Sequence, residues 1–292
     1  MGLNMLWSRE KILHPCRIPI PARLVYHRTW DLQNINMVLS YKKIMMLVPS
    51  LIFLLLLTVP AWAEDPVAEA DNLLKDPALG LSAALKALDL YTARLSQSSP
   101  PKVFLLVRLA RTCFIIGELT GREQRQKYYE EGRRYAEMLL QEAPNRVEGH
   151  YWLAMHLCGL ADTGGAMVGR RLLPQIMEEL KKAQAIDDAY DQAGSQRVLG
   201  RIYFEAPSWP FSVGDLQKSL QHLTRAVRLA PQNSTNHLYL AETLIKLHRE
   251  EAARQQLDQV LQATQHALLL RNLKDDQREA LSLLRRLALA NE

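Results

Sequence analysis

A short helical signature recurs along this chain and restricts the folds that it can adopt. Each copy has a leucine, a small residue (Ala or Gly) directly after it, and a larger residue three positions further on, a spacing that places side chains on one face of a helix. The copies begin at Leu109, Leu153, Leu199 and Leu240. The small residue lets two helices approach closely, and stacked helix pairs bury a core that a single pair cannot bury alone. The pattern predicts an all-α fold made of repeated helix pairs.

Prolines and glycines divide the helical stretches. Pro144 and Pro231 stand at the same offset before the leucines at 153 and 240. Proline stops a helix because it cannot donate the next helical hydrogen bond. From Glu64 onward no segment shows the alternation expected of a β-strand. Further helix breaks are predicted at Pro100-Pro101, Gly121, Pro174, Pro207 and Pro210.

The pattern resembles the tetratricopeptide repeat (TPR). The best copy runs from Ser234 to about Ala263, and a second good copy spans Arg197 to Pro231. Successive leucine anchors lie 44, 46 and 41 residues apart (109 to 153, 153 to 199, 199 to 240), against about 34 for a plain TPR. That spacing also suits HEAT-like repeats, but the Leu–small and Ala-to-Pro signatures favour TPR pairs with insertions.

The resemblance implies a right-handed superhelical stack of antiparallel helix pairs with inserted loops and a C-terminal capping helix. We place the extra residues between paired helices, in Gly159–Leu173 and Ala206–Gly214. A helix from Asp275 to Ala290, with Asp275 as its N-cap, is expected to close the stack.

The stretch before Glu64 has the pattern of an export signal. Lys42-Lys43 precede an apolar run from Ile44 to Val59, and Ala61-Trp62-Ala63 offers small residues at the two positions that signal peptidase inspects. We expect cleavage after Ala63 and a periplasmic repeat domain over 64–292. The alternative is an uncleaved membrane anchor, although the run is slightly shorter than the ~20 residues that span a bilayer. In both cases the two lysines place the rest outside the cytoplasm.

Residues 1–36 do not fit a signal peptide. We interpret them as a non-native upstream extension, with translation starting at Met37 or at Met45 and the signal peptide at 37–63. The formal charge of +5 belongs to this leader, because seven basic and two acidic residues precede Glu64, leaving 29 basic (36 − 7) and 29 acidic (31 − 2) residues from Glu64 onward. Nucleic-acid binding needs a basic footprint, so this function class is set aside.

A narrower resemblance follows from the order of several motifs. They are Val147-Glu148-Gly149-His150-Tyr151-Trp152, Asp162-Thr163-Gly164-Gly165, Val198-Leu199-Gly200-Arg201-Ile202-Tyr203, Ala206-Pro207-Ser208-Trp209-Pro210 and Gly214-Asp215. This succession is similar to the T component of tripartite ATP-independent periplasmic (TRAP) transporters, over about Ala68 to Leu261. The resemblance implies a non-enzymatic partner of a periplasmic solute-binding protein, capable of self-association, with an apolar passage for a small solute.

Candidate binding residues come from the first helix of each pair, which lines the concave face of such a stack. Aromatic and aliphatic side chains with arginines suit an apolar ligand or peptide that carries a carboxylate. Several of these residues are equally compatible with ordinary packing, and Trp209 with covering the core, plugging a passage or anchoring a partner. The set is Phe104, Arg111, Phe114, Tyr151, Met155, Arg197, Arg201, Phe204 and Trp209.

Motifs of catalysis are not found. The segment Gly164–Arg171 lacks the Lys-Ser/Thr pair of a phosphate loop and is interpreted as a flexible loop between helices. His150 and His156 are six residues apart, which places them on different sides of a helix. Cys113 and Cys158 are interpreted as unpaired buried thiols, with a disulfide as the alternative. We therefore expect no catalytic residue, no metal and no cofactor.

Two hypotheses of function follow. In the first, the protein is an accessory of a TRAP-type transport system that contacts a solute-binding protein and passes on a small apolar or carboxylated solute. In the second, it is a general TPR scaffold for protein assembly in the cell envelope, without a small-molecule ligand. A continuous apolar passage would favour the first hypothesis, and an open polar groove would favour the second.

Overall fold

A computed structural model describes residues 65–75, 80–98, 102–263 and 273–289. The chain divides into two units, Met1–Trp62 and Ala63–Glu292. The upstream extension, the signal peptide and the cleavage site after Ala63 lie outside the described residues, so these remain predictions. No helix of the described part has the length and apolar character needed to cross a membrane.

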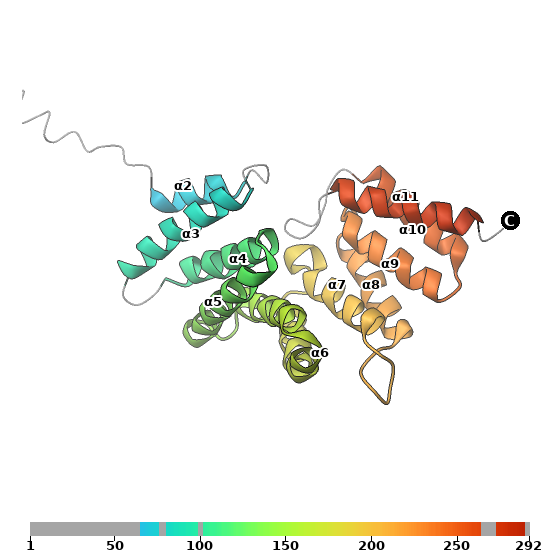
Figure 1. Cartoon of the computed structure of the whole chain (residues 1–292), viewed down its shortest axis with the longest axis horizontal. Helices are drawn as coiled ribbons and strands as arrows, with labels where there is room; N and C mark the ends of the chain where they lie inside the picture. The colour runs from blue at the N-terminus through green and yellow to red at the C-terminus, as the bar shows by residue number, and fades with distance from the viewer. Residues whose placement is uncertain (1–64, 76–79, 99–101, 264–272, 290–292) are drawn as a thin grey trace, which may run out of the picture. The chain divides into compact units, whose positions relative to one another are not determined.

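The described residues of the second unit fold into α-helices, which confirms the predicted fold class (Figure 1). The helices are α2 (Pro66–Leu73), α3 (Gly80–Ser96), α4 (Val103–Leu119), α5 (Arg122–Glu142), α6 (Val147–Ile186), α7 (Tyr190–Glu205), α8 (Leu216–Leu229), α9 (Ser234–Lys246), α10 (Glu250–Gln262) and α11 (Leu273–Leu289).

The helices form a TPR-like stack of antiparallel pairs. The pairs are α4 with α5, the two arms of α6, α7 with α8, and α9 with α10. The first helices of successive pairs also contact one another, α4 with α6, α6 with α7 and α7 with α9. The last helix, α11, packs on both α9 and α10, as expected of a capping helix.

The recurring leucine–small signature lies in the core. All four leucine anchors and the small residues that follow them are buried. The packing at Gly200 shows why the second position is small, because a Cβ added there would lie 2.5 Å from Leu223 Cγ on α8. The signature therefore marks the seams between paired helices, as the sequence predicted.

Side-chain caps fix where several helices begin. Asp65 accepts a hydrogen bond from Val67 N at the start of α2, and Asp215 accepts bonds from two backbone amides of α8. Asn233 does the same for Asn236 N in α9. Such caps satisfy amides that have no partner inside the helix.

One predicted loop is wrong. The residues of Gly159–Leu173 are helical, and α6 reverses at Gly165 alone, whose φ of 77° and ψ of −177° are open to glycine but not to residues with a side chain. The two arms run back along each other. A contact between them shows this: His150 Nδ1 in the first arm lies 2.6 Å from Glu179 Oε2 in the second. The extra residues therefore lengthen the arms. Pro174, predicted to break a helix, lies inside the second arm.

The predicted start of the last helix is also wrong. Asp275 lies within the first turn of α11 and forms an ion pair with Arg278, so it is not the N-cap. Its neighbour Asp276 is fully buried and accepts hydrogen bonds from the hydroxyls of Ser234 (2.6 Å) and Thr235 (2.8 Å) at the start of α9. This buried carboxylate fixes the capping helix to the last repeat.

Candidate functional site

Two adjoining cavities open among α6, α7, α9 and the loop after α7. The smaller, about 240 Å³, lies among α6, α7 and α9, and the larger, about 620 Å³, lies between the arms of α6, the end of α7 and the loop that follows it. Cys158, Ile202 and Glu205 line both cavities, so we describe them together as the groove. Its apolar walls are formed mainly by Met155, Leu173, Ile176, Val198, Ile202 and Tyr239.

A buried ion pair forms one end of the groove. Arg197 is 2% exposed, and its guanidinium lies 3.0 Å from the carboxylate of Asp191. The guanidinium also donates to Asn236 Oδ1 at 3.2 Å, to Gln192 O at 3.1 Å and to the carbonyl oxygen of Asp191 at 3.3 Å. Tyr151 donates to Asp191 at 2.5 Å, and burial raises the pKa of its hydroxyl well above the usual range. Arg197 is therefore held in place by α6, α7 and α9 together.

The backbone around this ion pair is strained. Asp191, Gln192 and Ala193 all have left-handed conformations, with φ values of 50°, 56° and 63°. Such conformations cost roughly 1–2 kcal/mol per residue for side chains with a Cβ. Asn233 and Asn236 of the next repeat hold this turn by bonds to the side chain and the carbonyl of Gln192. The strain persists because the surrounding hydrogen bonds fix the turn.

Arg201, one helical turn further along α7, is also neutralised. It pairs with Glu205 at 2.5 Å and with Glu242 of α9. Its guanidinium carbon lies 4.5 Å from the ring centre of Tyr239 and 4.9 Å from that of Phe204. A carboxylate ligand would have to displace an existing acidic partner to bind Arg201.

The other sequence-predicted residues are distributed more widely. Met155 lines the smaller cavity and Phe204 lies under Lys246, with the ammonium 3.7 Å from the ring centre. Phe114 and Tyr151 are 3% and 1% exposed and belong to the hydrophobic core. Trp209, by contrast, is 85% exposed on the loop after α7.

Two predicted residues lie on α4, away from the groove walls. Phe104 is 41% exposed, near the start of the helix, and has Arg108 over its ring at 5.5 Å. Arg111 is half-buried, and its Nε has no hydrogen-bond partner among the described residues. The structure therefore brings together Met155, Arg197 and Arg201, and leaves Phe104 and Arg111 outside this cluster.

Sequence reasoning missed several groove residues. Cys158, Ile202 and Tyr239 line the groove. They are close in sequence to the repeat signature, and the sequence alone did not distinguish them from residues that pack in the core. Asp191 was missed because no local pattern signals three consecutive left-handed residues without a glycine. Tyr239 directly precedes the Leu240 anchor, and its place in the repeat could have identified it as a groove residue.

The chemistry of the groove supports binding more than catalysis. Cys113 and Cys158 are free, and burial raises the pKa of the Cys158 thiol to about 12, which keeps it protonated and a poor nucleophile. Among the described residues no group of His, Cys, Asp and Glu is arranged to hold a metal ion. An apolar groove with internally paired charges is suited to receive an apolar ligand or protein segment.

Comparisons with known proteins agree with the helical-repeat architecture. Residues 67–213, half of the chain, match the family model described as Regulator of microtubule dynamics protein 1-3. Residues 211–276 match a model of the tetratricopeptide repeat. No curated protein matches this chain.

A solved structure shows the same fold. The crystal structure of a thermophilic TPR protein from Thermus thermophilus aligns with a TM-score of 0.55 and 19% sequence identity, covering 75% of this chain and 98% of that one. At this level of identity the likeness concerns the fold alone. It supports the TPR resemblance that the leucine–small signature predicted.

Proposed function

Because this chain belongs to the family of regulator of microtubule dynamics proteins 1-3 and is a TPR-type helical-repeat scaffold, we propose that it acts by binding another protein rather than by catalysis. The observation that carries the proposal is the groove itself. Its two adjoining cavities span three repeats and are mainly apolar, with walls from α6, α7, α9 and the loop after α7. TPR stacks present this kind of extended surface to their partners.

The charges around the groove specify the kind of segment that fits. Arg197 is neutralised by Asp191, and Arg201 by Glu205 and Glu242. The groove therefore favours a segment that fills it with apolar side chains over one that depends on a carboxylate. Aliphatic or aromatic anchors of a short helix or extended peptide match these walls.

Two proposals differ in the cellular compartment where this chain binds its partner. The family name connects its members with microtubule dynamics, and in that setting the partner is a microtubule component or regulator. Our reading of the leader instead proposes export with cleavage after Ala63, where the partner is a periplasmic protein and microtubules are absent. The mass of the processed chain distinguishes them, since export predicts an N-terminus at Glu64.

Peptide selection with a blocked groove tests the binding proposal. Peptides selected from a displayed library on the wild-type protein are titrated by calorimetry against Val198→Phe, which fills the smaller cavity. The matched control is Gln255→Phe, which adds the same ring on the exposed face of α10. We expect Val198→Phe to weaken binding by about tenfold or more and the control to leave it unchanged. Equal binding by the two variants, or no selected peptide, would contradict the proposal.

The size of the larger cavity favours one second candidate function. At about 620 Å³ it lies within the range of small-molecule sites, roughly 300–1,000 Å³. Passing a small solute in a TRAP-type system, with a solute-binding protein as partner, is therefore the alternative. Native mass spectrometry of the protein from its own cell extract reports subunit number, bound solute and bound protein together. A co-purified small carboxylate with a solute-binding protein would replace the scaffold proposal by the transport one.

A further inference from the structure

The loop after α7 holds two aromatic side chains out of the stack. Trp209 and Phe211 are 85% and 80% exposed. The base of the loop is closed by backbone hydrogen bonds from Gly214 N to Pro207 O and from Asp215 N to Tyr203 O, both 2.9 Å. Exposed aromatic rings normally fold back onto a core, because burying them is favourable. This loop is instead closed in a form that presents them outward.

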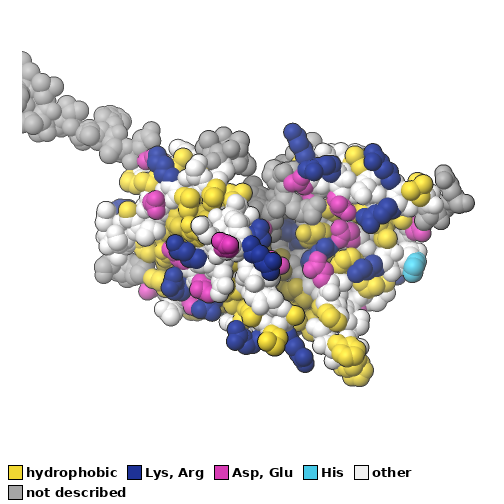
Figure 2. All heavy atoms as spheres, viewed as in Figure 1, with side chains coloured by type: hydrophobic (Ala, Val, Ile, Leu, Met, Phe, Trp, Pro, Cys, Tyr) yellow, Lys and Arg dark blue, Asp and Glu magenta, His cyan; other side chains and the backbone are white. Residues whose placement is uncertain are grey.

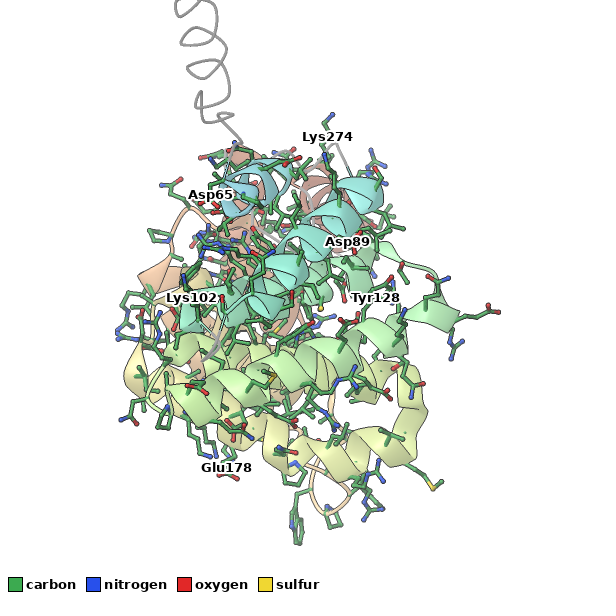
Figure 3. All side chains as sticks on the ribbon, turned by 90° about the vertical axis from the view of Figure 1, so that its left-hand side faces the viewer. Asp65, Asp89, Lys102, Tyr128, Glu178 and Lys274 are labelled. Atoms are coloured by element: carbon green, nitrogen blue, oxygen red, sulfur yellow. The ribbon has the colours of Figure 1, made fainter. Side chains whose placement is uncertain are left out.

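The turn of α6 lies next to this loop. Gly169 and Arg170 line the larger cavity together with Phe211, so the two segments adjoin. Met167, in the same turn, is 88% exposed. The long hairpin of α6, whose second arm carries Glu178, and the loop after α7 reach the same edge of the stack in both ribbon views (Figure 1, Figure 3). Figure 2 shows hydrophobic side chains at this edge, with Lys or Arg side chains along it.

The charge at this edge is positive. Arg170 and Arg171 are exposed and make no ion pair among the described residues. Of the two carboxylates that line the same cavity, Glu205 pairs with Arg201, and Asp162 is exposed with its nearest cation, Arg125, 3.9 Å away. We call Met167, Arg170, Arg171, Trp209 and Phe211 the aromatic edge.

We infer that the aromatic edge docks on an anionic lipid membrane. Trp and Phe prefer the boundary between headgroups and acyl chains, and neighbouring arginines are attracted to anionic headgroups. A protein partner is less well matched, because stable protein interfaces bury about 800 Å² on each side, whereas a projecting loop offers only a few side chains. Shallow insertion of a few apolar side chains together with basic residues is sufficient for reversible membrane binding. Docking here leaves the groove accessible from its other end, among α6, α7 and α9.

Vesicle binding by the full chain tests the inference. Flotation is measured with phosphatidylcholine vesicles and with vesicles that contain about one-third phosphatidylserine. We expect Trp209→Ser/Phe211→Ser to lower the partition coefficient by about tenfold on anionic vesicles. Arg170→Gln/Arg171→Gln should lower it on anionic vesicles only. The matched control, Leu289→Ser, removes an exposed apolar side chain of α11 and should change nothing.

A local readout separates the edge from the apolar leader, which is present in every variant. Lipids brominated on their acyl chains quench tryptophans that enter the bilayer, and Trp209→Phe removes only one of the five tryptophans. The wild type should show a quenched component that Trp209→Phe lacks. Identical quenching of the two proteins, or equal flotation of the double variant, would overturn the inference. Loss of self-association without loss of vesicle binding would assign the edge to a protein contact and overturn it as well.

Discussion

The helix pair of α6 and the pair formed by α9 and α10 begin with the same device. Near the start of the first helix a histidine Nε2 lies 2.9 Å from the carbonyl oxygen of the proline six residues earlier, His150 with Pro144 and His237 with Pro231. In both pairs Nδ1 of the same ring contacts the second helix. In these two pairs the histidine therefore joins the linker, the first helix and the second helix.

The two pairs differ in length, and the difference accounts for the larger cavity of the groove. Helices α9 and α10 have 13 residues each and are joined by a short turn that contains His248. The α6 pair has 40 residues and reverses at Gly165. Its arms therefore extend beyond those of an ordinary repeat, and this extension lines the larger cavity and carries Met167 and Arg170. The ordinary pair lines the smaller cavity with Thr235 and Tyr239, and the lengthened pair lines the larger cavity from both of its arms.

The largest expected loss of stability comes from removing Arg197, which lies on α7 between the two pairs and contacts α9 through Asn236. Arg197→Met removes the guanidinium that joins Asp191 to Asn236 and leaves a carboxylate without its partner in a buried site. We expect the free energy of unfolding to fall by about 3 kcal/mol, measured by urea denaturation. The control is Arg201→Met on the same helix, where the ion pairs are more exposed and the loss should be about 1 kcal/mol or less. Equal losses would show that burial of the pair is unimportant.

Of these two pairs, the α6 pair should be the more sensitive to pH, through His156; a second histidine whose pKa burial lowers, His222, lies outside both pairs, on α8. Burial lowers the pKa of His156 to about 4, whereas the equivalent position of the α9 pair holds Thr243, which does not titrate. Because the unfolded chain binds a proton near pH 6.5 and the folded chain does not, this stability is complete above that pH and is lost as the pH falls toward 4. We expect about 2 kcal/mol to be lost between about pH 7.5 and pH 5.

Hydrogen exchange locates this effect. On acidification, amides of α6 should lose protection more than amides of α9 and α10. The variant His156→Gln, which keeps a donor for the carbonyl of Ala110, should lose less stability over the same pH range. An equal pH dependence of variant and wild type would assign the acid sensitivity to other groups.

The sequence predicted the fold because the TPR signature is local. The Leu–small seams and the linker prolines act within one pair, so their spacing specifies the stack without knowledge of distant contacts. It did not predict the length of α6, because a reversal at one glycine leaves the same helical pattern on both sides as a flexible loop bounded by helices would. The buried ion pair of Arg197 was also beyond reach, since the left-handed turn of α7 brings Asp191 to it and the packing of the next repeat brings Asn236.

The turns of the two pairs should respond oppositely to a change in backbone freedom. Gly165 has a conformation that strains any residue with a Cβ, so Gly165→Ala should destabilise the protein by about 1.5 kcal/mol. His248 has a positive φ of 58° in the α9–α10 turn, so His248→Gly should relieve strain and stabilise by up to about 1 kcal/mol. Thermal and urea unfolding of both variants measure the signs. Destabilisation by both would mean that the side chain of His248, not its backbone, matters at that turn.

The smallest expected effect comes from giving His150 the kind of partner that His237 has. Both ring nitrogens of His150 face acceptors, Pro144 O and the carboxylate of Glu179, whereas His237 meets the amide of Gln256, which can present either its oxygen or its nitrogen. Glu179→Gln gives the α6 pair the partner that the last repeat uses. We expect a loss of about 0.5–1 kcal/mol, because a charge-assisted hydrogen bond becomes a neutral one.

Glu179 also accepts a bond from Lys182 at 3.0 Å, so Lys182→Met is the matched control. That lysine is exposed, and its removal alone should change stability by only a few tenths of a kcal/mol. If Glu179→Gln costs no more than Lys182→Met, the carboxylate adds nothing to the histidine device. The two repeats are then equivalent in their histidine contacts, and the length of their arms is the larger difference between them.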